Sequence, residues 1–197
     1  MKLYLLIISC CVAMVSIILS LTYKTSFLAV LGLTTMATVL VILVDGAVAG
    51  MARMLPKRVA NYRLKVYAVS KREKNFYEKL KIRNWKEKLP EIGHFTGFRK
   101  NKIAEPKSVE YIDRFLLEIC YGELGHFASI FFGFLILFFL YDLPIWQPIC
   151  LCVAGINGLL NMPFIFILRY NSYKLLILRK SNIKKQNASN PQAEIKC

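Results

Sequence analysis

Apolar residues run through this chain in long stretches that contain almost no charge. The first two runs are Leu3–Leu21 and Phe27–Val44, and a later run, Ile149–Leu168, contains two asparagines. At about 1.5 Å per helical residue, a run of this length covers roughly 28 Å, close to the hydrocarbon core of a bilayer. A shorter run, Phe127–Tyr141, spans a bilayer only if its helix begins earlier, near Leu116. The pattern predicts an all-α integral membrane protein with about four transmembrane helices in two hairpins.

Between the two hairpins, apolar and basic residues alternate at helical spacing. The apolar positions are Phe76, Tyr77, Leu80, Ile82, Trp85 and Leu89. Lysines and an arginine fill most of the positions between them, and Pro90 ends the pattern. A basic amphipathic helix with a tryptophan on its apolar side is typical of the headgroup layer of an anionic membrane, so the sequence predicts an interfacial helix here.

These patterns divide the chain into four segments. We expect an N-terminal transmembrane hairpin over residues 1–52 and a basic cytoplasmic or interfacial loop over 53–115. A C-terminal transmembrane hairpin that carries the functional site follows over 116–175, and a polar, disordered tail over 176–197.

The basic residues fix the expected orientation. Of 27 lysines and arginines, 18 lie between Arg53 and Arg114, and seven lie between Arg169 and the C-terminus. With four spans, the positive-inside rule places both termini and the basic loop in the cytoplasm of a multi-pass cell-membrane protein. The net charge of +15 is thus explained by topology, and we expect membrane lipid rather than nucleic acid as a partner.

Three ionisable residues lie where the basic loop meets the third span: Glu118, Glu123 and His126. Taking Glu118 as zero on a helix, Glu123 falls near 140° and His126 near 80°, so the imidazole projects between two carboxylates. A carboxylate beside an imidazole fixes its tautomer and raises its basicity, which suits a general base that takes a proton from a hydroxyl. The structural alternative is an interfacial helix start at which Glu118 favours the helix dipole.

A metal site is the other chemistry that these residue types allow. Within the apolar spans, the Glu-x-x-His spacing of di-iron helix bundles occurs once, at Glu123 and His126, and the other histidine of the chain, His94, lies in the loop. So few ligands predict no metal and no cofactor. Cys120 is a weak nucleophile candidate, because nothing in the sequence lowers the pKa of its thiol.

The fourth span adds amide and guanidinium groups. Asn161 and Arg169 are eight residues apart, as are Glu118 and His126, so Asn161 and His126 are expected at similar depth. A base, an amide donor and a cation at one level would form a pocket open to both lipid and cytoplasm. The structural alternative is that an amide such as Asn157 only joins helices.

Three blocks of the sequence resemble a known family. They are Ile82–Pro90 (IRNWKEKLP), Glu118 followed by Glu123-Leu124-Gly125-His126, and Asn161-Met162-Pro163 leading to Arg169-Tyr170-Asn171. In order and spacing they are similar to the glycosyl-4,4'-diaponeurosporenoate acyltransferases, bacterial membrane proteins of carotenoid biosynthesis. The resemblance covers roughly Phe76 to Leu175 and implies transfer of a fatty acyl chain to a sugar hydroxyl of a glycosylated carotenoid or related glycolipid.

On this reading the partners are an acyl-CoA-like donor and a glycosylated lipid acceptor. His126 would be the general base, oriented by Glu123 and by Glu118. Substrate contacts would come from Asn161, Arg169, Asn171, Trp85, Lys86 and Lys88, with the cations on the phosphates of the donor. The competing hypothesis is a non-catalytic membrane protein, a transport component or assembly partner, whose polar residues are helix-packing contacts.

Overall fold

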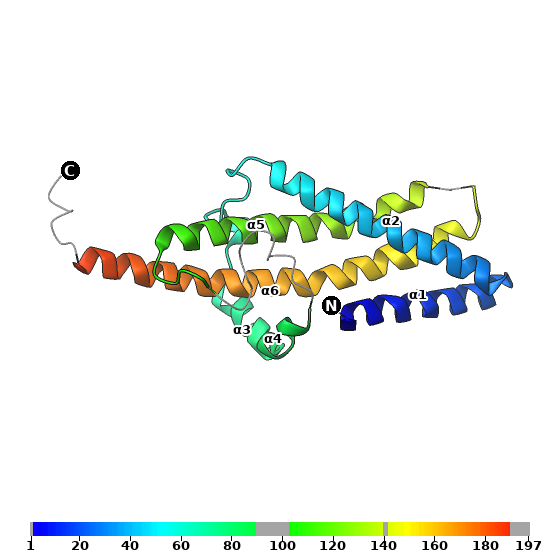
Figure 1. Ribbon diagram of the computed structural model, residues 1–197, viewed down its shortest axis with the longest axis horizontal. Helices are drawn as coiled ribbons and strands as arrows, with labels where there is room; N and C mark the ends of the chain where they lie inside the picture. Colours follow the sequence, from blue (N-terminus) through cyan, green and yellow to red (C-terminus); the bar gives the residue numbers. More distant parts are fainter. Residues whose placement is uncertain (1, 90–102, 140–141, 190–197) are drawn as a thin grey trace. The chain divides into compact units, whose positions relative to one another are not determined.

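The computed structural model describes residues 2–89, 103–139 and 142–189, which form helices and, within those ranges, no strands. In chain order the elements are α1 (Lys2–Tyr23), α2 (Phe27–Met54), η1 (Lys65–Tyr67), α3 (Lys71–Lys79), α4 (Ile82–Trp85), η2 (Lys86–Lys88), α5 (Val109–Phe132), η4 (Gly133–Phe138) and α6 (Trp146–Ser189). Four helices of the described chain are long and apolar enough to cross a membrane: α1, α2, the α5–η4 stretch and α6. The all-α membrane fold predicted from the sequence is confirmed, and the chain is a multi-pass membrane protein (Figure 1).

The chain separates into two compact units. Unit 1 comprises residues 1–55, 88–90 and 121–165, and unit 2 comprises residues 56–87, 91–120 and 166–197. Because α5 and α6 are long, each contributes one part of its length to unit 1 and the other part to unit 2.

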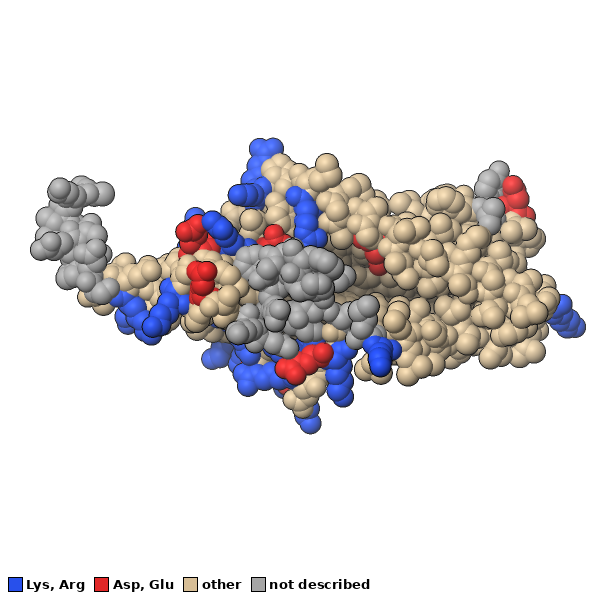
Figure 2. All heavy atoms as spheres, viewed as in Figure 1, with Lys and Arg blue, Asp and Glu red and all other residues tan. Residues whose placement is uncertain are grey.

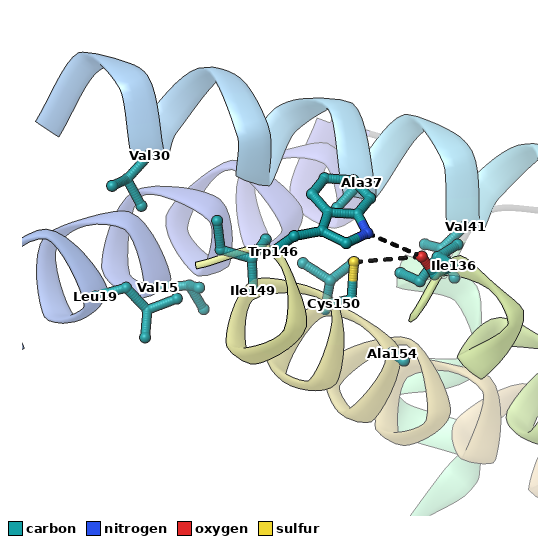
Figure 3. Packing of buried hydrophobic residues seen from close by; sticks show 11 residues of the cluster. Val15, Leu19, Val30, Ala37, Val41, Ile136, Trp146, Ile149, Cys150 and Ala154 are labelled. Atoms are coloured by element: carbon teal, nitrogen blue, oxygen red, sulfur yellow. Dashed lines mark hydrogen bonds between the residues drawn. The ribbon is translucent and has the colours of Figure 1, made fainter. Parts of the chain in front are cut away.

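Unit 1 is held together by small and branched apolar side chains between α1, α2, η4 and the start of α6 (Figure 3). Its largest fully buried side chain is Trp146, whose indole Nε1 donates to the carbonyl oxygen of Ile136 at 3.2 Å. The Cys150 thiol lies 3.6 Å from the same oxygen. These bonds satisfy a buried carbonyl where the chain leaves regular α-helix. Ala37, fully buried, keeps α2 close to this cluster.

Unit 2 has its own core, formed by one face of α5 and the later part of α6. The fully buried members are Ile112 and Leu116, and Phe115, Ile119 and Leu175 surround them. The α5 helix begins with the Ser108 hydroxyl accepting from the Tyr111 amide at 3.1 Å, a side-chain cap that fixes its first turn. This start at Val109 lies earlier than the position near Leu116 expected from the sequence, and it gives the third span ample length.

The interfacial helix expected across the basic loop is divided in two. The α3 helix ends at Lys79, Lys81 takes a left-handed conformation with φ of 51°, and α4 starts at Ile82. Tyr77 and Ile82 are both buried, yet five residues on one helix would put them about 140° apart. The break lets both side chains reach the interior of unit 2, which one continuous helix would prevent.

The polar C-terminal segment is largely helical. The α6 helix continues to Ser189, so the expectation of a disordered tail from residue 176 is wrong for the part that the structure describes. At about 1.5 Å per residue α6 is roughly 66 Å long, about twice the hydrocarbon thickness, so it is longer than one crossing of a bilayer requires. Asn182 helps to hold the polar end of α6, since its amide donates to the Pro106 carbonyl at 2.8 Å.

Charge is distributed unevenly over the surface. In Figure 2 the lysines and arginines of the described residues gather over α3, α4 and the last part of α6, whereas the surface over α1 is mostly tan. Exposed leucines and isoleucines on α1, such as Leu5, Leu6 and Ile18, fit a lipid-facing surface.

Candidate functional site

The candidate site is a hydrogen-bonded chain of polar side chains inside unit 1. Asn157 and Asn161 lie one turn apart on α6, and both are buried. Asp45 reaches them from α2 and His126 from α5. Burying a polar side chain among membrane-spanning helices costs free energy unless the side chain is hydrogen-bonded. Each of these side chains bonds to a residue on another helix.

The carboxylate of Asp45 sets the direction of the hydrogen bonds along this series of polar side chains. Its Oδ1 accepts from Asn157 Nδ2 at 3.1 Å, and its Oδ2 accepts from Asn161 Nδ2 at 3.3 Å. Asn161 Nδ2 also lies 3.0 Å from the carbonyl oxygen of Asn157. Both amide nitrogens donate to the oxygens of Asp45, so the amide nitrogen of Asn161 faces Asp45 and its oxygen faces the other way.

That orientation selects the tautomer of His126. Asn161 Oδ1 lies 2.8 Å from the imidazole Nδ1. Since this oxygen can only accept, Nδ1 carries the proton and Nε2 keeps a lone pair. The ring also stacks on Phe164, with centroids 4.9 Å apart and planes 8° from parallel. The imidazole is therefore held in one plane and one tautomer, with its basic nitrogen on the side away from Asn161.

The Nδ1 atom of His126 contacts the amide of Asn161. The orienting role expected of Glu123 and Glu118 stays a prediction. Glu123 is buried in unit 1, three residues before His126 on α5. Glu118 is half-buried and belongs to unit 2.

Asp45 is the functional candidate that the sequence interpretation missed. The available signal was an acidic residue inside an otherwise charge-free stretch, which is by default a functional feature.

The expected substrate residues divide between the units. Asn161 and Lys88 belong to unit 1, and Trp85, Lys86, Arg169 and Asn171 belong to unit 2. Lys88 is exposed, and Asn171 is half-buried on α6. Trp85 donates through its indole Nε1 to the Leu80 carbonyl at 2.9 Å, which satisfies the broken end of α3.

Arg169 is engaged in an ion pair rather than open to a phosphate. Its Nε and Nη2 reach the two oxygens of Glu73 at 2.5 and 3.1 Å, and it also donates to the carbonyls of Val66 and Ala68. Partial burial acts to raise the pKa of Glu73, but hydrogen bonds from Arg169 and Tyr77 outweigh it, so this pKa lies below its usual value. Arg169 therefore fastens the 66–79 segment to α6.

Among the residues that the structure describes, no three His, Cys, Asp or Glu side chains lie together in a way that could hold a metal ion. The polar chain in unit 1 is thus built from one carboxylate, two amides and one imidazole. This set can hold and move a proton at His126 Nε2.

A family model for glycosyl-4,4'-diaponeurosporenoate acyltransferase matches residues 61–181, well over half of the chain. The chain belongs to this family. It is an acyltransferase of carotenoid biosynthesis, which acylates a glycosylated carotenoid. The match contains His126, Asn157 and Asn161, whereas Asp45 precedes it. No curated protein and no solved structure matches the chain.

The polar chain of unit 1 contains residue types that acyl transfer requires. Transfer of an acyl group to a hydroxyl requires a base for the hydroxyl proton and an acid for the leaving group. An imidazole with a fixed tautomer can serve as both in turn.

Proposed function

We propose that His126 is the general base of this acyltransferase and that Asn161 and Asp45 position it. The observation that carries the proposal is the 2.8 Å contact between Asn161 Oδ1 and His126 Nδ1, with the amide itself oriented by Asp45. This arrangement leaves Nε2 as the proton acceptor. Asp45 orients the amide of Asn161, and this amide orients His126, so the imidazole can accept a proton through Nε2.

The reaction proceeds by one addition and one elimination. A sugar hydroxyl of the glycosylated carotenoid attacks the carbonyl carbon of an acyl thioester, and its proton passes to His126 Nε2. The tetrahedral intermediate collapses, the carbon–sulfur bond breaks, and the imidazolium returns the proton to the departing thiolate. The products are an ester and a free thiol, and the histidine ends as it began.

The second part of the proposal concerns placement in the membrane. The basic loop and both termini lie in the cytoplasm, as the distribution of lysine and arginine favours. The acyl and isoprenoid chains enter from the bilayer, where both are soluble. A thioester donor approaches from the cytoplasm, where such donors are made.

The test is acyl transfer by membranes that contain the protein, read by mass spectrometry as one acyl increment on the glycosylated acceptor. His126→Ala should lower the rate by about 10²- to 10⁴-fold, the usual contribution of a general base. Phe127→Ala is the matched control, since that side chain is the next on α5 and is 54% exposed. Immunoblots of the membrane fraction should show equal amounts of all three proteins.

The same experiment separates catalysis from helix packing. If the polar chain only joins helices, His126→Ala reduces the amount of protein in the membrane while transfer per molecule stays at the wild-type level. That outcome would refute the proposed role of His126.

A further inference from the structure

A cluster of cations surrounds Tyr170 in unit 2. Arg83 donates through Nε to the Tyr170 hydroxyl oxygen at 3.0 Å. Lys174, one turn along α6, places its Nζ 4.2 Å from the centre of the Tyr170 ring. The tyrosine thus holds a guanidinium at its hydroxyl and an ammonium on its face, and all three residues belong to the same unit.

Lys86 adds a third cation. Burial lowers the pKa of Lys86, and the charge of Lys174 and then of Arg83 lowers it further, against the opposing attraction of Glu87. Burial is the larger cause of this lowered pKa, and Lys174 and Arg83 are cations that act on Lys86 in the same direction. An anion at this position would relieve the repulsion.

Among the described residues, the acids that act on this cluster are Glu78 and Glu87, and they are fewer than the cations around them. Glu78 forms an ion pair with Lys74 at 2.7 Å, so the charge of Lys74 balances the charge of Glu78. Arg83 donates through Nε to Tyr170, and its two terminal nitrogens form no hydrogen bond to the residues that the structure describes. A guanidinium with two such nitrogens suits a ligand that offers paired oxygens.

We propose that Arg83, Lys86 and Lys174 form a binding site for a phosphate ester. Phosphate offers several oxygens and up to two negative charges, which matches a guanidinium flanked by two ammonium groups. Tyr170 and Lys174 stand two and six residues beyond Leu168, where the apolar run of α6 ends. A phosphate at this level belongs either to a phospholipid headgroup or to a soluble cofactor-like ester, and both present the same group.

The test follows the reactivity of Lys86 toward acetic anhydride, read by peptide mass spectrometry on the full chain in nanodiscs. A bound phosphate favours the ammonium form and can raise a lysine pKa by about one unit, so labelling of Lys86 should fall about tenfold. Exposed Lys65 is the internal reference, because its labelling should not change.

Two arms identify the source of the phosphate. In neutral phosphatidylcholine nanodiscs, coenzyme A is added and protection of Lys86 assigns the site to a soluble ester. In nanodiscs that contain phosphatidylglycerol, protection without coenzyme A assigns the site to a lipid headgroup.

The variants decide whether the cluster itself binds. In the double variant Arg83→Gln, Lys174→Gln, labelling of Lys86 should be the same with and without ligand. Lys79→Gln, an exposed change on α3, should leave the protection of Lys86 by ligand intact. Protection of Lys86 in neither arm, or unchanged protection in the double variant, overturns the proposal. Because binding is measured without acyl transfer, His126→Ala should retain it, so this proposal and the proposed function fail independently.

Discussion

At the residue scale, the sequence predicted that His126 and Asn161 lie together, but it did not predict Asp45 beside them. His126 and Asn161 were expected at similar depth because each lies eight residues from its polar partner along a helix. The structure joins them at 2.8 Å. Helical spacing gives the depth of a side chain and the helix face on which it lies. It does not show which amide or carboxylate of another helix lies near that side chain. That is why Glu123 was favoured over Asp45, which is 81 residues away from His126 in the chain.

Asp45 should be required for full activity because it positions the base, whereas His126 accepts the proton itself. Asp45→Asn keeps the size of the side chain and one acceptor oxygen, but loses the charge and the second acceptor for Asn157 and Asn161. The amide of Asn161 is then free to turn its nitrogen toward the imidazole and select the wrong tautomer.

We expect transfer by Asp45→Asn to fall about tenfold to a hundredfold, as when a partner that orients a histidine is lost. The loss should lie in kcat rather than in KM, measured on solubilised enzyme. Thr38→Val on the same helix is the control, since its hydroxyl bonds only to the Thr34 carbonyl within α2. An unchanged kcat in Asp45→Asn would show that the carboxylate does not position the base.

At the element scale, helix contacts explain what periodicity could not. The basic loop has helical spacing throughout, yet it is broken at Lys81 because Tyr77 and Ile82 both become buried. A sequence pattern shows that residues are apolar but not that two of them share one interior. The polar end of α6 was misjudged for a related reason, since its helix is fixed by contacts such as Asn182 with the Pro106 carbonyl.

Close packing of η4 against the polar chain gives one prediction. A Cβ added at Gly133 would lie 3.0 Å from Asn157 Nδ2 and 3.3 Å from Val41 Cγ2. The Asn157 amide is held by Asp45 and cannot move away without losing that bond. Gly133→Ala should therefore destabilise the fold by about 1–3 kcal/mol, the usual cost of overpacking.

Gly32→Ala is the matched control, because nothing lies within 4 Å of its added Cβ. That variant should be neutral or more stable by up to about 1 kcal/mol, since alanine favours helix over glycine. The thermal midpoints of both variants in detergent check this. Equal midpoints would mean that the contact at Asn157 relaxes without cost.

The clamp between Arg169 and Glu73 gives a prediction about pH. The folded-state pKa of Glu73 is lowered, so the clamp stabilises the fold fully above the ordinary carboxyl value, about 4.3, and is lost as the pH falls through the lowered folded value. Pepsin cleavage within residues 66–79, normalised to an unstructured substrate, should rise about tenfold over that acid range.

Glu73→Gln should raise this cleavage already above pH 4.3 and flatten its dependence on pH, because the titrating group is absent. Glu110→Gln is the control, since Glu110 forms a highly exposed pair with Arg114. If the cleavage profile of Glu73→Gln matches the wild type, the clamp does not hold the segment.

At the scale of the whole molecule, the long apolar runs and the placement of the basic residues carried most of the prediction. The four membrane-length helices and the acyltransferase family were both anticipated from the sequence and are confirmed. Hydropathy succeeds here because a long apolar segment that crosses a bilayer can satisfy its backbone polar groups within a helix. The division into two compact units could not be anticipated, because α5 and α6 run through both and no linker marks a boundary.

The proposed orientation can be measured with a membrane-impermeant maleimide in intact cells. In a background without the native cysteines, Lys24→Cys lies between α1 and α2 and should be labelled. Lys65→Cys lies in the basic loop and should be labelled only after the membrane is opened. The reverse pattern would place the basic loop and the termini outside the cell.

The most direct test of the central claim is the pH dependence of kcat/KM for acyl transfer. If His126 takes the proton of the acceptor, the wild-type rate should rise with pH through one ionisation and reach a plateau once the imidazole is neutral. In His126→Ala this step should disappear, and a residual rate should continue to rise as hydroxide replaces the base. A variant profile that keeps the wild-type step at the same pH would contradict the account, because another group would then accept the proton.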